Sequence, residues 1–537
     1  MNDNSTPPQD QRVLVIGSGP VGQSAALCLA RWGIPVTLLD ARPERDPIGS
    51  KALCQQRDVL DLWDACGAGA IATEGLTWKD ARTFYQDGEL FAWSIPDSGK
   101  SPLPPFVNIS QSRTEALLDE AIAASPLIEE KWGHEVVGIS GGADGQGPAV
   151  VRCRTADGEV EVSGEYAIVC CGSKGGPIRE LLGVEFPGRT FEDSFLICDI
   201  EATLPGWEHE RRFYFDPVWN PGRQVLIHPC PNSIYRIDWQ VPTDFDLAQA
   251  QADGSLDKRI RQVIGEQDYR IDWVSVYRFH SRSADKYAVG RFLLAGDVAH
   301  LVAPFGARGL NSGVPDVENA AWKIAFVLKG WGGPGLLDSY QPERQAAARE
   351  NLAVTTATMD FLVPQNDEQR EHRTTVLERA KTDTTAIPLV DSGRLAEPFW
   401  YVESALTTAD PRRPWPGRPA RGQAPEPVPG VILPDAATPG AAHGASRVRQ
   451  LTRQGLLVLV GDDVNVAEVE GVLGGVVPQG LPVRVLRFAD LGDEGVVAAS
   501  LKAADDELWL IRPDAHTAAC VTTPEALADA VRTVLGR

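Results

Sequence analysis

The residues whose types and spacing point most directly to chemistry follow a short apolar run near the middle of the chain. This run, 292–295, has the character of a buried strand, and Asp297 comes two residues after it. In open α/β sheets, ligands are held where the strands end. Glycine permits a positive φ and lets a backbone lie flat against a ligand. The segment after Asp297 contains Pro304, Gly306, Gly309, Asn311 and Gly313. A carboxylate followed by such a segment is typical of a site that holds a large flat ring.

A helix is expected directly after this segment. Apolar residues recur at steps of three and four over residues 317–328, which is the spacing of one helix face. The amino terminus of this helix would point its free N–H groups and the positive end of its dipole at a ligand lying over the glycines. A ring that carries carbonyl oxygens or negative charge fits that arrangement.

A second glycine motif lies near the amino terminus, between a predicted strand at 12–16 and a predicted helix at 23–32. The motif reads Gly17-Ser-Gly19-Pro-Val-Gly22, and Asp40 follows a further predicted strand at 36–39. Such a turn is typical of dinucleotide binding, with two glycines beside the pyrophosphate and Gly22 allowing the helix to pack on the strand. Asp40 would accept hydrogen bonds from a ribose. The motif alone does not separate FAD from NAD.

The 291–316 segment resembles the second FAD motif of the flavoprotein aromatic hydroxylases, which are single-component monooxygenases with the p-hydroxybenzoate hydroxylase fold. The resemblance implies that Asp297 contacts the ribityl chain, that the proline and glycines pass beside the isoalloxazine, and that the Leu-Asn pair bonds its pyrimidine edge. The resemblance therefore favours FAD over NAD as the dinucleotide that the two motifs bind. The residues expected to bind FAD are Gly17, Gly19, Pro20, Val21, Gly22, Asp40, Arg42, Lys51, Gln111, Asp297, Pro304, Gly306, Gly309, Leu310 and Asn311.

Three positions bear on how closely the chain follows that family. Gln111 matches a family glutamine that contacts the cofactor, although a simple helix start is the alternative. Lys51 stands where the family usually has an arginine, and lysine keeps the charge but lacks the planar fork. Cys171 replaces a family aspartate that serves both FAD and the nicotinamide cofactor. Nicotinamide binding by this route is therefore left open.

From residue 199 to residue 285 the pattern changes to alternating strands, expected at 212–216, 224–228, 234–241 and 272–279. In the family such a sheet binds the substrate above the flavin. Hydroxylation of a phenol is easier when the pocket offers a base, because a free phenol has a pKa of about 10. The candidates for catalysis on the sheet are Tyr214, His228 and Tyr235. Each of them is equally compatible with a plain core position.

The predicted fold class is α/β, with a Rossmann-like FAD-binding domain interleaved with a mixed β-sheet substrate domain and followed by a thioredoxin-like domain. The FAD-binding domain is expected at 11–198 and 286–380, with 75–110 contributing to the substrate region. The substrate domain is expected at 199–285, a helical segment and a Pro/Gly linker at 381–446, and the thioredoxin-like domain at 447–537. Cys520 is the only cysteine of that last domain, which excludes dithiol chemistry there.

Charge, apolar runs and cysteine content limit the classes of partner and the compartment to be expected for this chain. The net charge of −22 argues against nucleic acid and against an anionic membrane surface. The chain has no apolar run long enough to span a bilayer, and residues 1–11 are polar, without the apolar core of a signal peptide. Nine cysteines without CxxC spacing favour a reducing cytoplasm over a disulfide framework or a zinc site. A homodimer is an open alternative.

The resemblance covers about residues 11–380 and implies an FAD-dependent aromatic ring hydroxylase. NADPH or NADH would reduce the FAD, and O₂ would add to give a C4a-hydroperoxide that hydroxylates a phenolic or polycyclic substrate. A flavin oxidase, dehydrogenase or halogenase is the alternative that Cys171 motivates. Residues 91–96 faintly echo a halogenase motif, but we interpret them as part of a β-hairpin. An interaction protein with a vestigial flavin fold is the third hypothesis.

Overall fold

The computed structural model describes residues 11–46, 52–95, 97, 99–420 and 423–537. Its centre is a six-stranded sheet with the strand order β17-β18-β11-β1-β2-β7. The strands are β1 (Val13–Ile16), β2 (Val36–Leu39), β7 (Ile128–Lys131), β11 (Tyr166–Val169), β17 (Ala288–Val289) and β18 (Phe292–Leu294). All neighbours are parallel except β17 and β18. Four of these strands, β1, β2, β11 and β18, are buried along their whole length and mostly apolar, as expected for a parallel sheet covered on both faces.

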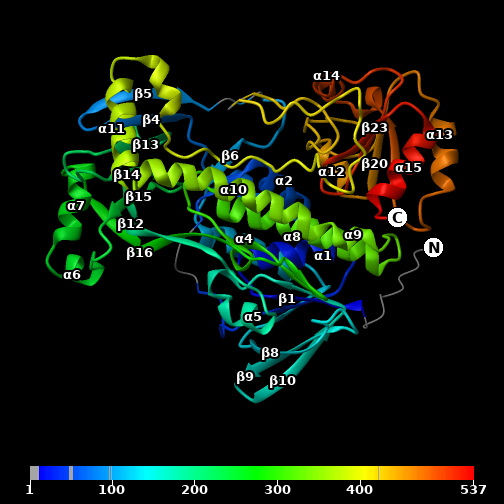
Figure 1. Ribbon diagram of the computed structural model, residues 1–537, viewed down its shortest axis with the longest axis horizontal. Coiled ribbons are helices and arrows are strands. Elements are labelled where there is room, and N and C mark those ends of the chain that lie inside the picture. Colours follow the sequence, from blue (N-terminus) through cyan, green and yellow to red (C-terminus); the bar gives the residue numbers. More distant parts are fainter. Residues whose placement is uncertain (1–10, 47–51, 96, 98, 421–422) are drawn as a thin grey trace.

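Helices cover one face of this sheet, and a small meander covers the other (Figure 1). The helices are α1 (Pro20–Arg31), α4 (Gln111–Ala123) and α8 (Arg308–Leu328), with α2 (Arg57–Ala65) and α3 (Ala70–Glu74) beside them. The meander consists of β8 (Glu135–Gly141), β9 (Ala149–Thr155) and β10 (Gly158–Gly164), next to α5 (Gly176–Leu181). A two-stranded ribbon pairs β3 (Cys54–Gln56) with β6 (Phe106–Asn108).

The second large sheet has eight strands in the order β19-β16-β12-β15-β14-β13-β4-β5. They are β4 (Asp80–Tyr85), β5 (Gly88–Ser94), β12 (Gly188–Ala202), β13 (Glu210–Phe215), β14 (Gln224–Pro229), β15 (Ile234–Val241), β16 (Tyr269–Ser283) and β19 (His300–Leu301). All four strands expected between residues 199 and 285 are present, and β4 and β5 form the predicted hairpin. The sheet also extends beyond the expected range, because β12 begins at Gly188.

One face of the eight-stranded sheet packs on α6 (Leu247–Ala252) and α7 (Ser255–Ile264). Helices α9 (Gly335–Asp338), α10 (Tyr340–Leu362) and α11 (Asp367–Ala380) follow α8. Phe361 on α10 and Leu377 on α11 pack with Phe213 of the opposite sheet face. In Figure 1 the eight-stranded sheet lies on the left, the tail on the right, and α8 and α10 between them.

Segment 381–446 differs from a free linker. It contains one short 3₁₀ helix, Thr384–Leu389, and otherwise no helix or strand among its described residues. Its apolar residues Val428, Val431 and Leu433 are nevertheless buried. The backbone of this segment, expected as a helical segment and a Pro/Gly linker, is largely irregular and packs against the rest of the protein.

The tail contains a four-stranded sheet in the order β21-β20-β22-β23. Its strands are β20 (Leu456–Val460), β21 (Val483–Arg487), β22 (Leu508–Ile511) and β23 (Thr517–Val521), and only β20 and β21 are parallel. Its helices are α12 (Arg449–Thr452), α13 (Val466–Gly474), α14 (Val496–Leu501) and α15 (Pro524–Val534). The thioredoxin-like assignment of residues 447–537 stays a prediction.

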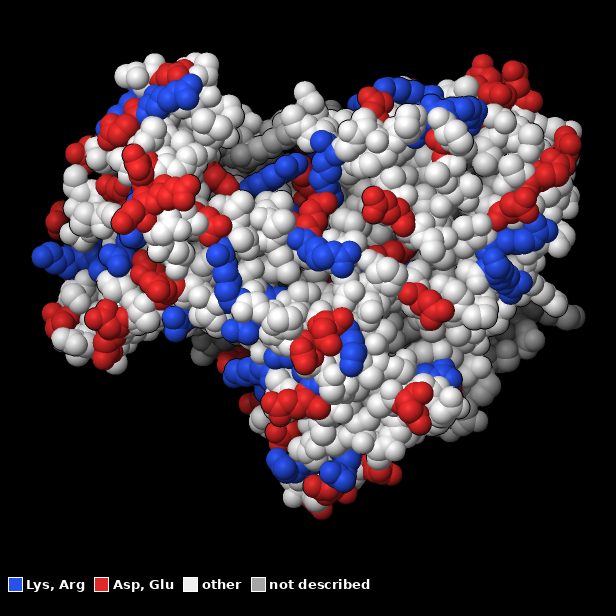
Figure 2. All heavy atoms as spheres, viewed as in Figure 1, with Lys and Arg blue, Asp and Glu red and all other residues white. Residues whose placement is uncertain are grey.

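The surface carries both signs of charge. On the face shown in Figure 2, lysine and arginine side chains are interspersed with aspartate and glutamate. Within the described part of the chain, no helix combines the length and the apolar character needed to cross a bilayer.

Candidate functional site

A cavity of about 790 Å³ lies where the two large sheets approach each other. Ile16, Leu39 and Ala295, at the carboxyl ends of parallel strands β1, β2 and β18, line one side. Phe195, Ile197 and Leu226 of the eight-stranded sheet line another. The predicted cofactor residues that line it are Gly17, Gly19, Pro20, Val21, Asp40, Arg42, Gln111, Asp297, Pro304, Gly306, Gly309, Leu310 and Asn311. Two glycine motifs about 280 residues apart in the chain therefore meet in one cavity.

The three glycines of the first motif are required for different reasons. Gly17 has a φ of +105°, and a Cβ there would lie 2.6 Å from the carbonyl oxygen of Cys170. A Cβ at Gly22 would lie 1.8 Å from the carbonyl oxygen of Gly17, so this glycine allows α1 to approach β1. Gly19 has open space beside it and faces the cavity at the start of α1. The free N–H groups of that helix start suit a phosphate or another anion.

Asp40 lies at the end of β2 with its carboxylate already hydrogen-bonded. It accepts bonds from the Ser18 N–H at 2.7 Å and from the Arg42 N–H at 2.9 Å. The Arg42 guanidinium adds two bonds of 2.9 Å. Burial alone would raise the pKa of Asp40, but the hydrogen bonds from Arg42 and Ser18 outweigh it and lower the pKa. Asp40 is thus a fixed anion that a ribose would have to share with Arg42.

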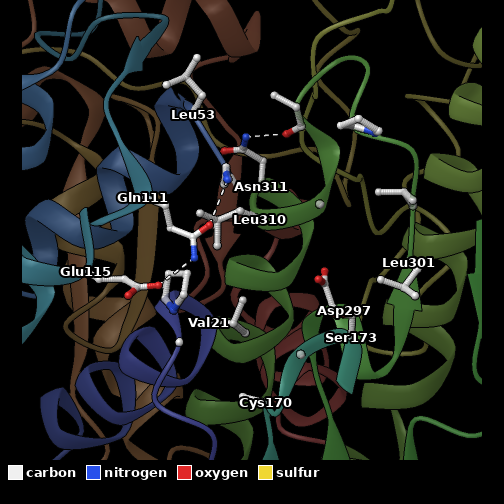
Figure 3. Close-up of a pocket in the computed structure, with 18 of the residues that line it drawn as sticks. Val21, Leu53, Gln111, Glu115, Cys170, Ser173, Asp297, Leu301, Leu310 and Asn311 are labelled. Atoms are coloured by element: carbon white, nitrogen blue, oxygen red, sulfur yellow. Dashed lines mark hydrogen bonds between the residues drawn. The ribbon is translucent and has the colours of Figure 1, made fainter. Parts of the chain in front are cut away.

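Gln111 lies both at the start of a helix and at the wall of the cavity. It is the first residue of α4, which Ser110 caps by accepting a hydrogen bond from the Arg113 N–H. Gln111 also lines the cavity, accepts a bond from the Ala52 N–H at 3.0 Å and donates one to Glu115 at 2.8 Å (Figure 3). Lys51 lies outside the described residues.

Asp297 is the exposed residue in an otherwise buried stretch. It stands on a single 3₁₀ turn, Gly296–Val298, close to the end of β18. Figure 3 shows its side chain at the cavity, close to Ser173. Behind it, buried Asp316 accepts hydrogen bonds from the Gly296 N–H at 2.9 Å and from His300 at 2.7 Å. His300 is therefore part of the support of the turn.

Helix α8 begins nine residues earlier than the hydrophobic pattern predicted, at Arg308 instead of residue 317. Asn311 consequently lies in its first turn. The Asn311 side chain accepts a bond from the Gln56 N–H at 2.8 Å and donates to the carbonyls of Cys54 and Ala307 (Figure 3). The Asn311 amide is thus already hydrogen-bonded to β3 and to its own helix. The groups of this turn that remain available to the edge of a bound ring are the free backbone N–H groups at the helix start.

The structure places the three catalytic candidates on different faces of the eight-stranded sheet. His228 lines the cavity. Tyr235 is buried on the opposite face, in the core that includes α6 and α7, and Tyr214 packs there on Phe84, with ring centroids 4.5 Å apart. Neither tyrosine is among the residues that line the cavity. Tyr235 shares its face of β15 with Ile237 and Trp239, and all three belong to this core.

Charged residues that the sequence reasoning did not select occupy the cavity face instead. They alternate with the core residues of the same strands, and they are Arg211, Arg236 and Asp238. Arg236 lies opposite His228 on β14 and opposite Asp199 on β12, to which it donates two hydrogen bonds of 2.8 Å. The available signal was the sequence Tyr-Arg-Ile-Asp-Trp, because charges that alternate with large apolar residues in a strand must face a polar site or solvent.

Burial changes the ionisation of several groups in the cavity. It lowers the pKa of His228, with Arg211 and Arg236 adding to the effect, and it raises the pKa of Asp238 to about 7. The thiol of Cys171, which stands at the cavity wall, has its pKa raised by burial to about 12. Cys171 is therefore neutral near pH 7 and does not replace the charge of an aspartate.

These features fit a bound FAD. The cavity offers a helix start open beside Gly19, an acid after β2, and a second helix start with flat backbone at the motif of Asp297. The chain belongs to the FAD binding domain family, which matches residues 10–355.

Similar proteins are hydroxylases and monooxygenases. The chain is 27% identical over 418 residues to a 3-(3-hydroxy-phenyl)propionate/3-hydroxycinnamic acid hydroxylase of Mycolicibacterium smegmatis, a match that covers 75% of this chain and 70% of that one. Its match to the hydroxylase of the same name from Comamonas testosteroni covers 62% of that protein. A para-nitrophenol 4-monooxygenase of a Pseudomonas strain is 26% identical, with 69% and 92% covered.

Solved structures share the fold over the full chain. The flavin-dependent monooxygenase PieE, in complex with FAD and substrate, has a TM-score of 0.81 at 22% identity, with 98% of this chain and 99% of that chain covered. Aklavinone-11 hydroxylase, with FAD and aklavinone, has a TM-score of 0.77 at 22% identity, with both chains fully covered.

Proposed function

We propose that this protein is an FAD- and NAD(P)H-dependent monooxygenase that hydroxylates an aromatic substrate, phenolic or polycyclic, with O₂ as co-substrate. The observation that carries the proposal is that one cavity joins the FAD motifs to the aromatic face of the eight-stranded sheet. A ring held by the second motif would thus face a substrate on the sheet. The names of the similar proteins support the same reaction class.

FAD, when bound, supplies the redox and oxygen chemistry, and the chain supplies binding, orientation and exclusion of water. Phe195 and Phe279 stack with ring centroids 4.5 Å apart, and Phe305, directly after Pro304 of the FAD motif, packs edge-on against Phe195. All three line the cavity. This wall is suited to hold a flat aromatic substrate and to keep water from the reacting position.

A flavin oxidase, dehydrogenase or halogenase that does not use NAD(P)H in the family manner is the second candidate. It is favoured by Cys171, a neutral thiol at the cavity wall where the family has an aspartate that serves the nicotinamide cofactor. The two candidates differ in one measurable step, the reduction of bound FAD by NADPH or NADH.

The experiment mixes purified holoprotein with NADPH or NADH in the absence of oxygen and records the flavin absorbance, with and without phenolic compounds. We expect bleaching of the flavin band that phenols accelerate. Readmission of O₂ should then give a product heavier by one oxygen atom. If no phenol supports bleaching by either nucleotide, the hydroxylase proposal is wrong and the second candidate is favoured.

A further inference from the structure

Asp238 occupies a central and unusual position in the cavity. It lies on β15, with three strands on one side and four on the other. Its neighbours across the strands are Leu226 on β14 and Ile197 on β12, both apolar and both at the cavity wall. A carboxyl group in this setting cannot be explained by packing, because burial of a charge costs free energy unless a partner compensates it.

The carboxyl group of Asp238 lacks the partner that the neighbouring acid has. Asp199 is paired with Arg236 through two hydrogen bonds. In contrast, Asp238 Oδ1 is buried and has no hydrogen-bond partner within the described part of the protein. Buried polar atoms are nearly always hydrogen-bonded in folded proteins. Because this unpaired oxygen lies at the wall of a ligand cavity, we expect a bound ligand to supply the hydrogen-bond donor.

The other charged and titratable groups around Asp238 are Arg236 on the same strand, Asp199 on β12, His228 on β14 and Arg211 on β13. Burial, with Asp199, raises the pKa of Asp238 to about 7, and Arg236 and Arg211 partly oppose this. His228 is kept neutral, since its pKa is lowered. Asp238 thus exchanges a proton near neutral pH, which suits a general base.

We propose that Asp238 is the catalytic base that accepts the proton of the substrate's aromatic hydroxyl group. The phenolic O–H bond breaks, the proton passes to the Asp238 carboxylate, and the electron pair stays on the phenolate oxygen. The phenolate ring is the better nucleophile for hydroxylation, and the proton leaves to water after product release. This assignment rests on the proposed function and narrows its substrate to aromatic compounds with a free hydroxyl group facing β15.

The first test measures binding and needs no turnover. Oxidised holoprotein is titrated with 4-nitrophenol, 3-(3-hydroxyphenyl)propionate and 1-hydroxyanthraquinone, each beside its O-methyl ether, and the flavin spectrum reports binding. We expect at least one phenol to bind ten-fold or more tightly than its ether, because the ether leaves the carboxylate without a donor. In Asp238→Asn this preference should fall to about two-fold or less.

The second test measures hydroxylation against pH for the phenol that binds best. For the unmodified protein, kcat/KM should rise with a pKa near 7, since the carboxylate is the active form. In Asp238→Asn, kcat/KM should no longer rise with pH, and the hydroxylation rate should fall by at least about 100-fold. Asp238→Glu should restore part of the pH dependence and part of the rate. Tyr235→Phe is the matched control, because it removes a hydroxyl from the core face of the same strand.

The outcomes are distinguishable. The assignment of Asp238 is overturned if no phenol binds better than its ether, or if an FAD-loaded Asp238→Asn protein keeps the preference and the pH profile. A preference that depends on Asp238, in a protein that forms no oxygenated product with any phenol, overturns the proposed function and the catalytic role. It leaves Asp238 as the acceptor of a phenolic ligand.

Discussion

The glycines of the turn between β1 and α1 differ in what a side chain would meet at each position. A methyl group at Gly22 would overlap the carbonyl oxygen of Gly17, whereas one at Gly19 would have no atom within 4 Å. We expect Gly22→Ala to lower the free energy of unfolding by about 2 kcal/mol or more. Gly19→Ala should leave that stability unchanged and weaken FAD binding, because it narrows the helix start at the cavity. Urea denaturation of the apoprotein measures the change in stability, and titration with FAD measures the change in affinity. Equal losses of stability in the two variants would contradict the separate roles of Gly22 and Gly19.

Asp40 offers a second residue-scale prediction, on the binding of FAD. Asp40→Asn keeps the size of the side chain but removes the charge that Arg42 and Ser18 hold in place. We expect the dissociation constant of FAD to rise by about ten-fold or more. Because the folded pKa of Asp40 lies below its ordinary 3.8, the unmodified protein should keep this interaction at all pH values above 3.8 and lose it only as the pH falls further. Ultrafiltration, with flavin fluorescence read in the filtrate, measures the dissociation constant of FAD for the variant and its pH dependence for the unmodified protein. An unchanged affinity in Asp40→Asn would show that Asp40 does not contact the cofactor.

The same scale shows what sequence reasoning reaches and what it does not. The turn at Gly17, Gly19 and Gly22 was predictable because the spacing of glycines between a strand and a helix is a local pattern of the sequence. Asp238 was not found, although its neighbour Tyr235 was considered. A period of two tells which residues share a face of a strand, but the direction of that face depends on helices such as α7 that pack from elsewhere in the chain.

At the scale of elements, Asn311 fastens the start of α8 to the ribbon strand β3. Asn311→Ala removes three hydrogen bonds at once, to Gln56, Cys54 and Ala307. We expect the free energy of unfolding to fall by about 1–3 kcal/mol and FAD affinity to fall with it, since the helix start frames the cavity. Asn465→Ala is the control, because Asn465 is exposed and makes no side-chain capping bond. Thermal denaturation with and without added FAD compares the two variants. Equally small losses of stability in both would argue against a role of Asn311 in fastening α8 to β3.

The bounds of α8 illustrate how tertiary packing overrides local propensity. Gly309, Gly313 and Pro315 all disfavour a helix interior, so the apolar pattern alone placed its start at residue 317. In the structure, Gly313 lets the helix lie against Val21 and Gly296, where a Cβ would come within 2.8 Å of the valine side chain. Gly313 thus weakens the helix signal in the sequence and at the same time lets α8 approach the first cofactor motif at Val21.

At the scale of the whole molecule, buried charges join the tail to the FAD-binding part. Glu343 on α10 accepts hydrogen bonds from Lys323 of α8 at 2.6 Å and from Arg512 of the tail at 2.7 Å. Arg512 also bonds Asp514 at 2.7 Å, and Trp322 and Phe326 of α8 pack in the same core as the tail. Such contacts link residues far apart in sequence, so no local pattern predicts them. They make the tail a packed part of the molecule.

The last prediction concerns this junction and its dependence on pH. Arg512→Ala leaves Glu343 and Asp514 buried without their main cation, and we expect the free energy of unfolding at pH 7 to fall by about 3–5 kcal/mol. Arg532→Ala, which removes an exposed ion pair with Asp529, should change it by less than about 1 kcal/mol. The pKa values of Glu343 and Asp514 are lowered in the folded protein, because Arg512 and its neighbours outweigh the effect of burial.

Carboxylates with lowered pKa values stabilise the folded state above their unfolded pKa values, near 4, and this contribution is lost as the pH falls through the folded values. Removal of Arg512 raises both folded pKa values, so the two acids should take up protons at a higher pH in the variant. The difference in unfolding free energy between Arg512→Ala and the unmodified protein should therefore shrink between pH 7 and pH 4. Urea denaturation across this range, followed by tryptophan fluorescence, measures the difference, and a value independent of pH would mean that the loss comes from packing and not from unpaired charge.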